Sequence, residues 1–216
     1  MTRDANTDSA PRVWMRRLMR LWVGLLGMAL VAALVVASTD PKPTPPEDYG
    51  MVPEFALKSH LDREFGTANL RGNIWVANFI FTRCKTVCPI FSTKMAELEG
   101  RIAEVGHDVQ LVSFSVDPDY DTPAVLAQYA TQFTAQAGRW HFLTGPYQAI
   151  RSVVVDGMKM YIQDAESVDR PEDLMHGSHF VLVDGEHTIR GFYNVNNADT
   201  LDKVMEDINH LMAEGH

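Results

Sequence analysis

Two stretches in the middle of the chain are largely apolar and have the length of a β-strand. Ile74 to Phe81 reads IWVANFIF, and Val109 to Val116 reads VQLVSFSV. Both are rich in β-branched and aromatic residues, and the first has almost no polar position. This composition is typical of central strands that are covered on both faces. We therefore predict two buried strands at the centre of a sheet.

Helical periodicity follows each of these strands. Pro89 suits a first helical turn, and apolar positions recur at helical spacing until Gly106, which predicts the end of the helix. Thr122 is the expected N-cap of a second helix that runs from Pro123 to about Gly138. A third helix is predicted from Pro146 to Val155.

The remaining elements complete an alternating order. Glu54 to Arg71 predicts short strands and turns, and Trp140 to Leu143 predicts a short strand. His179 to Asp184 and Thr188 to Tyr193 predict a hairpin, and Ala198 to about Glu214 predicts a closing amphipathic helix. Strand, helix, strand, helix, then strand–strand–helix is the thioredoxin-like pattern. We predict an α/β protein with a central mixed sheet flanked by helices.

The N-terminal part of the chain has a different character. Leu21 to Ala37 reads LWVGLLGMALVAALVVA without a charge, and as a helix it spans about 26 Å. Arginines precede it and acidic residues follow it, so the positive-inside rule places residues 1–20 in the cytoplasm. We predict a single transmembrane anchor over residues 21–38. A cleaved signal peptide is the alternative, but the apolar run is long for one and no A-x-A site follows.

A proline-rich linker at residues 39–50 connects this anchor to a predicted domain at residues 51–216. The segment DPKPTPPED favours polyproline II, which acts as a semi-rigid spacer. The acidic residues near the N-terminus do not fit a mitochondrial presequence, so we expect a bacterial inner-membrane protein whose C-terminal domain faces the periplasm. The net charge of −9 argues against a nucleic-acid-binding surface.

Both cysteines of the chain lie in one short stretch, FTRCKTVCP, where the first central strand leads into its helix. The helix N-terminus favours thiolate, so we expect lowered pKa values for Cys84 and Cys88. A purely structural disulfide is a weak use of the pair, because closing so short a loop stabilises by only about 2 kcal/mol. Three residues separate the thiols, where a thioredoxin-type oxidoreductase has two. Two soft thiolates favour Cu(I), with Zn²⁺ as the usual competitor.

A third ligand is expected from the segment before the predicted hairpin. His176 and His179 precede or begin a strand that, in a thioredoxin-like sheet, pairs beside the cysteine strand. The residues alone do not choose between these two histidines. The other six lie singly in turns, at strand ends or near the C-terminus, where surface or packing roles are expected.

Four motifs together resemble the Sco/SenC family of copper-binding assembly factors for cytochrome c oxidase. They are FTRCKTVCP, SVDPDYDTP, WHFLTG and HGSHFVLVDGE, in an order that covers roughly Val52 to Met212. The resemblance implies a membrane-anchored thioredoxin-like domain that holds copper through Cys84, Cys88 and His176, with His179 as an alternative ligand. It also implies a redox-active disulfide between Cys84 and Cys88.

The expected function is a metallochaperone that delivers copper to the CuA-bearing subunit of cytochrome c oxidase. Other periplasmic copper chaperones or thioredoxin-like reductases are expected as further partners. A thiol–disulfide reductase that keeps the oxidase cysteines reduced is the main alternative, and a copper or redox sensor is another.

The chain departs from the family pattern at two places. Met175 stands where an acid often precedes the ligand histidine, and Lys85-Thr86 replaces the more usual Pro-Asp. The loss of negative charge is expected to weaken Cu(II) relative to Cu(I). Asp117, Asp119 and Asp121 are expected either to rim the site or to serve only as a turn and helix cap.

Overall fold

The computed structural model describes residue 15 and residues 18–29, 46–133, 138–160 and 178–215. The chain divides into two compact units, Met1–Thr44 and Pro45–His216. In the first unit, residues 18–29 form a helix. No helix within the described residues is both long and apolar enough to cross a membrane. Residues 30–38 of the anchor predicted at 21–38 lie outside the described residues.

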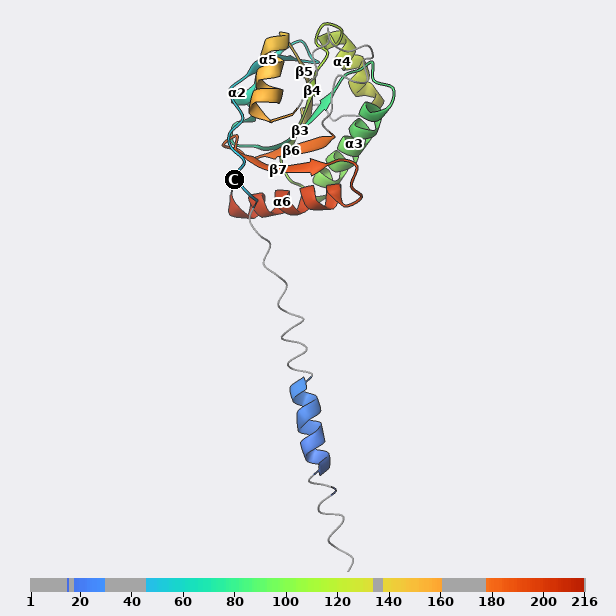
Figure 1. Cartoon of the computed structure of the whole chain (residues 1–216), viewed down its shortest axis with the longest axis vertical. Coiled ribbons are helices and arrows are strands. Elements are labelled where there is room, and N and C mark those ends of the chain that lie inside the picture. Colours follow the sequence, from blue (N-terminus) through green and yellow to red (C-terminus); the bar gives the residue numbers. More distant parts are fainter. Residues whose placement is uncertain (1–14, 16–17, 30–45, 134–137, 161–177, 216) are drawn as a thin grey trace, which may run out of the picture. The chain divides into compact units, whose positions relative to one another are not determined.

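The second unit is built on a seven-stranded sheet in the order β2-β1-β5-β4-β3-β6-β7 (Figure 1). The central strands β3, β4 and β5 run parallel, whereas β1, β2, β6 and β7 join by antiparallel pairing. The predicted mixed sheet is therefore confirmed. The strands are β1 (Ala56–Ser59), β2 (Glu64–Gly66), β3 (Ile74–Ile80), β4 (Val109–Ser115), β5 (Trp140–Thr144), β6 (His179–Val183) and β7 (Ile189–Asn194).

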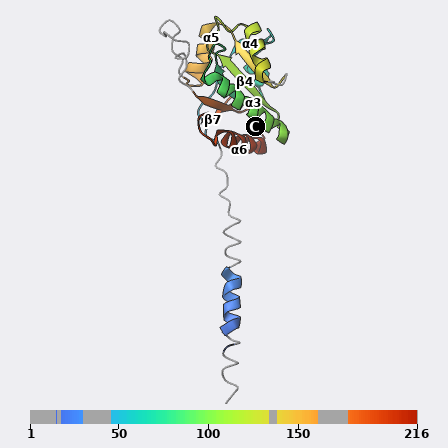
Figure 2. The same cartoon turned by 90° about the vertical axis from the view of Figure 1, so that its right-hand side faces the viewer.

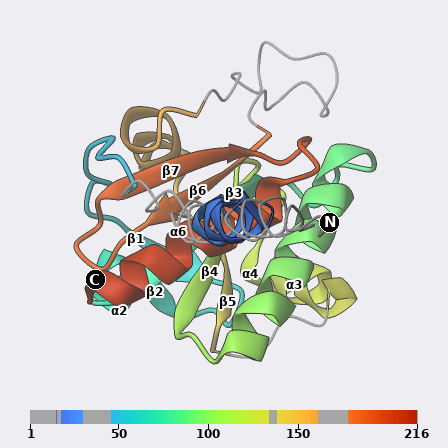
Figure 3. The ribbon, with the colours of Figure 1, turned by 90° about the horizontal axis from the view of Figure 1, so that it is seen from below.

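Helices cover both faces of this sheet. One core cluster joins Ile74, Val76 and Ile80 of β3 to apolar residues of α3 (Val87–Val105), α4 (Pro123–Ala130) and α6 (Thr200–Glu214). Figures 2 and 3 show these helices, with α3 and α6 across the same face.

A second core cluster lies on the opposite face. It joins the alternate β3 residues Trp75, Ala77 and Phe79 to α2 (Thr67–Leu70), α5 (Tyr147–Arg151) and a following π-helix, η2 (Ser152–Gly157). Because successive strand residues point to opposite faces, β3 needs apolar residues on both of them. This explains its nearly unbroken apolar run, in which Asn78 is the one polar residue and is buried, accepting from the hydroxyl of Ser113 at 2.6 Å.

The predicted central strands and the hairpin are confirmed to within one residue at each end. The long helix after the cysteines is also confirmed. It ends where Gly106 adopts a left-handed conformation, with φ of 74°, and donates its N–H to the carbonyl of Ala103.

Two helix predictions were wrong in extent. The helix predicted to run to about Gly138 ends at Ala130 and tightens into a 3₁₀ turn, η1 (Thr131–Phe133). There the ring of Phe133 packs against Tyr129 and Trp140, with ring centroids 5.0 Å and 6.3 Å away. This aromatic packing favours the tighter turn over a straight helical continuation.

The helix predicted from Pro146 to Val155 is α-helical only through Arg151 and then widens into η2. The N–H of Met158 bonds to the carbonyl of Val153, five residues back. The wider turn lets two consecutive valines, Val153 and Val154, both enter the core. A helical turn at Thr67–Leu70, between the predicted short strands, was not anticipated.

Candidate metal centre

The two cysteines lie at the carboxyl end of the central strand β3, at the entrance of α3. Cys84 is in the connecting loop and Cys88 is in the first turn of the helix. Both are free thiols, and both are buried, with side chains 5% and 0% exposed. The carboxyl ends of strands in α/β sheets are where reactive groups collect, as predicted for this pair.

The loop turns so that the helix start faces the first sulfur. The N–H of Cys84 donates to the carbonyl of Phe81 at 3.1 Å, which closes a tight turn after β3. The N–H of Cys88 then donates to Sγ of Cys84 at 3.4 Å, and the hydroxyl of Thr86 lies 3.7 Å from the same sulfur. The sulfur of Cys84 therefore accepts from an N–H group in the first turn of α3, which has no partner within the helix.

The surroundings shift the pKa values of the two thiols in opposite directions. Burial raises the pKa of Cys84, but hydrogen bonds from the backbone of Cys88 and Thr86 outweigh it, so the net pKa is lowered. Burial raises the pKa of Cys88 well above its ordinary value, and the nearby Cys84 sulfur adds to this. The prediction that the helix lowers both pKa values is thus wrong for Cys88, because deep burial dominates there.

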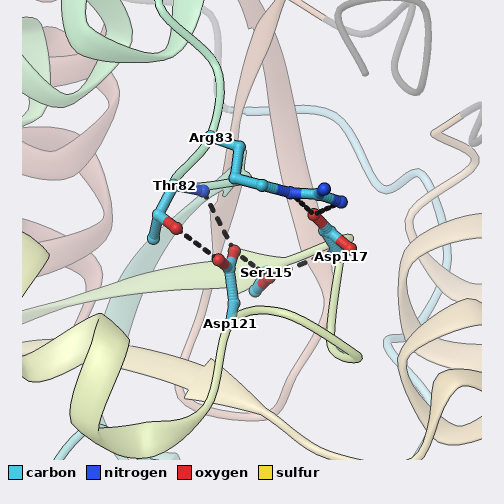
Figure 4. Close-up of polar contacts among 5 residues, drawn as sticks. All are labelled: Thr82, Arg83, Ser115, Asp117 and Asp121. Carbon is cyan, nitrogen blue, oxygen red and sulfur yellow. Dashed lines mark hydrogen bonds and ion pairs between the residues drawn. The ribbon is translucent and has the colours of Figure 1, made fainter. Parts of the chain in front are cut away.

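The two residues before Cys84 are held by the loop between β4 and α4 (Figure 4). The N–H of Thr82 donates to Asp121 at 3.0 Å, and its hydroxyl donates to the other oxygen of the same carboxylate. Arg83 donates from Nε and Nη2 to Asp117 at 2.9 Å and 2.6 Å.

Asp117 and Asp121 are also linked to each other, through the backbone of Asp117 and the side chain of Ser115. The backbone N–H of Asp117 donates to the hydroxyl of Ser115 at 3.2 Å, and this hydroxyl donates to Asp121 at 2.6 Å. The guanidinium of Arg83 lies 4.7 Å from the centre of the Tyr120 ring. A closed ring of polar contacts thus joins the start of the cysteine motif to the adjacent loop.

The acidic segment makes the expected turn before α4, in which the N–H groups of Tyr120 and Asp121 donate to the carbonyl of Asp117. Asp117 and Asp121 are buried beside the cysteine motif, whereas Asp119 is exposed. Thr122 is the predicted N-cap of α4, and its hydroxyl accepts from the N–H of Val125 at 3.4 Å. Thr82, Arg83 and Ser115 were not predicted as supporting residues. In the sequence, only their position within the FTRCKTVCP and SVDPDYDTP motifs points to them.

A cavity of about 440 Å³ adjoins the cysteine loop. No carboxylate is among its lining residues, which are Thr82, Arg83, Lys85, Tyr120, Val125, Gln128, Tyr129 and Gln132. Beside the motif, Val87 and Ile90 at the start of α3 are 41% and 56% exposed. The surface around the thiols is therefore part cationic and part apolar, in a chain whose net charge is negative.

His176 and Met175 lie outside the described residues, so the ligand set predicted from the resemblance remains a prediction. The start of β6 shows at which end of the sheet His179 lies. β6 pairs antiparallel with β3, with Val181 opposite Ala77, so its first residue, His179, lies toward the carboxyl end of β3. The chain that precedes His179 therefore enters the sheet at the end where the cysteines lie.

The histidines that the structure describes mostly have packing roles. His179 is partly buried, which lowers its pKa. His141 stacks on Phe65 with ring centroids 4.1 Å apart, and His60 packs edge-on against Phe142. Within the described ranges, no group of three or more His, Cys, Asp or Glu residues could hold a metal ion.

The chain is similar to known proteins in both sequence and structure. The family model SCO1/SenC matches residues 43–213 of the chain. The crystal structure of a SCO1/SenC family lipoprotein from Bacillus anthracis is 30% identical. The match has a TM-score of 0.72 and covers 78% of this chain and 99% of the lipoprotein.

Two further solved structures are similar over a comparable length. One is BsSco, described as a Sco-family cytochrome c oxidase assembly protein in which a disulfide switch was identified. It is 29% identical with a TM-score of 0.68, over 78% of this chain and 96% of BsSco. The other is Arabidopsis thaliana ScoI with copper bound, 27% identical with a TM-score of 0.61, over 74% of this chain and 98% of ScoI.

Proposed function

Since the chain belongs to the SCO1/SenC family, we propose that it is a copper metallochaperone that delivers copper to the CuA site of cytochrome c oxidase during assembly. The observation that carries the proposal is the pair Cys84 and Cys88, two free thiols at the carboxyl end of the central strand, one with a lowered pKa. The copper-bound relative and the oxidase-assembly relative support the choice of cargo and recipient.

In this proposal the cargo is held by the sulfurs of Cys84 and Cys88 and by the imidazole of His176. Thiolates are soft ligands that favour Cu(I), and an imidazole suits copper in both oxidation states. The register of β6 against β3 supports this set, because it brings the chain after residue 177 into the sheet at the cysteine end.

Transfer proceeds by ligand exchange. A thiolate of the recipient subunit displaces one of the three ligands while the other two keep hold of the ion, so copper is never released to water. Other periplasmic copper chaperones or thioredoxin-like reductases are the partners that load the site or keep it reduced. The exposed apolar side chains of Val87 and Ile90 beside the motif support such docking.

We place the protein in the bacterial inner membrane, with residues 21–38 as a single-pass anchor, residues 39–50 as a spacer and residues 51–216 in the periplasm. The uncharged run from Leu21 to Ala37, with arginines before it, supports this placement. Anchoring confines donor and recipient to one membrane and raises their effective concentration. The check is whether the intact chain stays in the membrane fraction after alkaline carbonate extraction, with the domain digested by protease in spheroplasts.

The proposed ligand set is tested by copper stoichiometry on the full chain. The wild type is expected to retain one copper, whereas Cys84→Ser, Cys88→Ser and His176→Ala are each expected to lose it during desalting. His179→Ala is the matched control and is expected to keep its copper. If His176→Ala retains copper as well as the control does, the three-ligand site is wrong.

A thiol–disulfide reductase is the second candidate, and the opposite pKa shifts of the two cysteines favour it. The thiolate of Cys84 attacks a partner disulfide, and Cys88 then displaces the partner. The Cys84–Cys88 disulfide forms as two electrons and two protons pass to the partner sulfurs. This activity needs no histidine. A His176→Ala variant that reduces the oxidase CuA cysteines at the wild-type rate supports the reductase, particularly if the wild type retains no copper.

A further inference from the structure

Asp121 is a fully buried carboxylate whose oxygens face the chain that leads into Cys84. It lies in the loop between β4 and α4 and is 0% exposed. One oxygen accepts from the hydroxyl of Thr82, and the other accepts from the N–H of Thr82 at 3.0 Å and from the hydroxyl of Ser115 at 2.6 Å. Three donors therefore compensate a carboxylate that would be costly to bury alone.

Both the backbone N–H and the side-chain hydroxyl of Thr82 donate to this one carboxylate. Thr82 is 39 residues from Asp121 in the sequence and only two residues before Cys84. It stands where the chain leaves β3, just after Phe81, whose carbonyl accepts from the N–H of Cys84. Any displacement of Thr82 is therefore passed directly to the turn that aims the Cys84 sulfur at the N–H of Cys88.

The neighbouring contacts fix the direction of the chain as well as its position. Arg83 is held by Asp117, and the backbone of Asp117 is joined to Asp121 through Ser115, as Figure 4 shows. Two successive residues before Cys84 are thus tied to one loop. Because its oxygens are already engaged by three donors, Asp121 is a support for the cysteines rather than a ligand.

We propose that Asp121 is a positioning residue: by holding Thr82 it sets the placement of Cys84 relative to Cys88, and so how tightly the pair retains copper. The copper part of this inference rests on the proposed function, whereas the placement of the cysteine loop does not. Removing a supporting contact of this kind around a metal site costs about 10–100-fold in metal affinity.

Two variants disrupt the contact between Thr82 and Asp121 in different ways, and a third variant preserves it. Asp121→Asn keeps the size of the side chain but replaces an accepting oxygen with an NH₂ that faces existing donors. Thr82→Val replaces the hydroxyl with a methyl group and leaves Asp121 and the backbone N–H donor of residue 82 in place. Thr82→Ser retains the hydroxyl and is the conservative rescue.

Asp184 supplies a matched control at the far end of the sheet. It too is a fully buried carboxylate, and it accepts from the N–H groups of Glu186 and Thr188, both at 2.9 Å, and from Arg190 at 2.7 Å. It follows β6 at the end opposite to the one where β3 leads into the cysteines. Asp184→Asn should therefore reduce stability without reaching the thiols.

The first readout needs no metal. Amide hydrogen exchange is followed over residues 82–88 of the full, metal-free chain. Asp121→Asn and Thr82→Val are expected to speed exchange at Cys84 and Cys88 by about tenfold or more beyond their change in global stability, whereas Thr82→Ser and Asp184→Asn are expected to leave these amides at the rate set by global stability. Unchanged exchange at Cys84 in both Asp121→Asn and Thr82→Val overturns the positioning role.

The second readout is the affinity for Cu(I) in competition with a chelator. Asp121→Asn and Thr82→Val are expected to bind about 10–100-fold more weakly than the wild type, with Thr82→Ser and Asp184→Asn close to it. Equal losses in Asp184→Asn would overturn the proposal, since the effect would then be one of general stability. If the wild type binds no copper, the proposed function fails, and the exchange measurement alone still decides whether Asp121 positions the loop. Should Asp121→Asn not fold, the comparison of Thr82→Val with Thr82→Ser decides both readouts.

Discussion

The backbone N–H of Cys88 points at the sulfur of Cys84 from 3.4 Å, so the second cysteine of the motif stabilises the charged form of the first. Cys84 does not stabilise the charged form of Cys88 in return. The Cys88 side chain is fully buried, and its thiol has a raised pKa. The two sulfurs are neighbours with different chemistry, and this difference has measurable consequences.

We expect alkylation of the reduced protein at pH 7 to modify Cys84 before Cys88. The thiolate is the nucleophile, and each unit of pKa changes its population about tenfold, so the rates should differ by more than about tenfold. Mass spectrometry of peptides after brief iodoacetamide treatment measures both rates. The single variants supply the control: Cys88→Ser should react quickly and Cys84→Ser slowly. Equal rates in the two variants would contradict the asymmetry.

Copper binding should become tighter as the pH rises. Cys88 is protonated in the metal-free protein because its pKa is raised, and it must lose that proton to bind a metal. Between about pH 6.5 and 8.5, we expect the apparent affinity for copper to increase about tenfold per pH unit for each proton that copper displaces. Competition titrations at several pH values measure this slope. A flat profile would mean that copper binding releases no proton from Cys88, so Cys88 would not be a thiolate ligand.

His141 should make stability depend on acidity. Burial, together with a smaller contribution from the neighbouring His60, lowers its pKa from the ordinary value of 6.5 to about 4, against a smaller opposite effect from the Gly138 backbone. The unfolded chain therefore binds the proton more readily than the folded one, so stability is fully present above about pH 6.5 and is lost as the pH falls towards 4.

The variant His141→Phe keeps a ring that can stack on Phe65 and removes the titration. We expect denaturant unfolding between pH 7 and pH 4 to show a shallower loss of stability for this variant than for the wild type. The same loss in both would assign the acid sensitivity to other groups, such as His60, whose pKa is also lowered by burial.

Gly100 inside α3 and Gly106, which caps its C-terminal end, should respond in opposite ways to alanine. A Cβ at Gly100, inside the helix, would meet nothing within 4 Å, so Gly100→Ala should stabilise by up to about 1 kcal/mol through helix propensity. Gly106 has a φ of 74°, which costs other residues about 1 kcal/mol or more. Gly106→Ala should therefore destabilise by about that amount. Denaturant midpoints of the two variants test the signs, and a gain in stability for Gly106→Ala would be incompatible with the helix end described here.

Much of the scaffold could be predicted from local pattern. The run from Ile74 to Phe81 indicated a strand buried on both faces, and β3 divides its side chains between two separate core clusters. The placement of Cys84 and Cys88 at its carboxyl end followed from the strand–helix order. Element ends were less predictable, because the packing of Phe133 and the entry of both Val153 and Val154 into the core depend on distant partners.

The sequence by itself determined the alternating elements, the apolar N-terminal segment and the joining of both thiols to one helix entrance, because these depend on the order and periodicity of neighbouring residues. Only the tertiary structure decided that Cys88 is buried deeply enough to resist ionisation, and that Thr82 and Asp121 meet across 39 residues. Burial and long-range hydrogen bonds exist only once the sheet has formed, so no local pattern of residues encodes them.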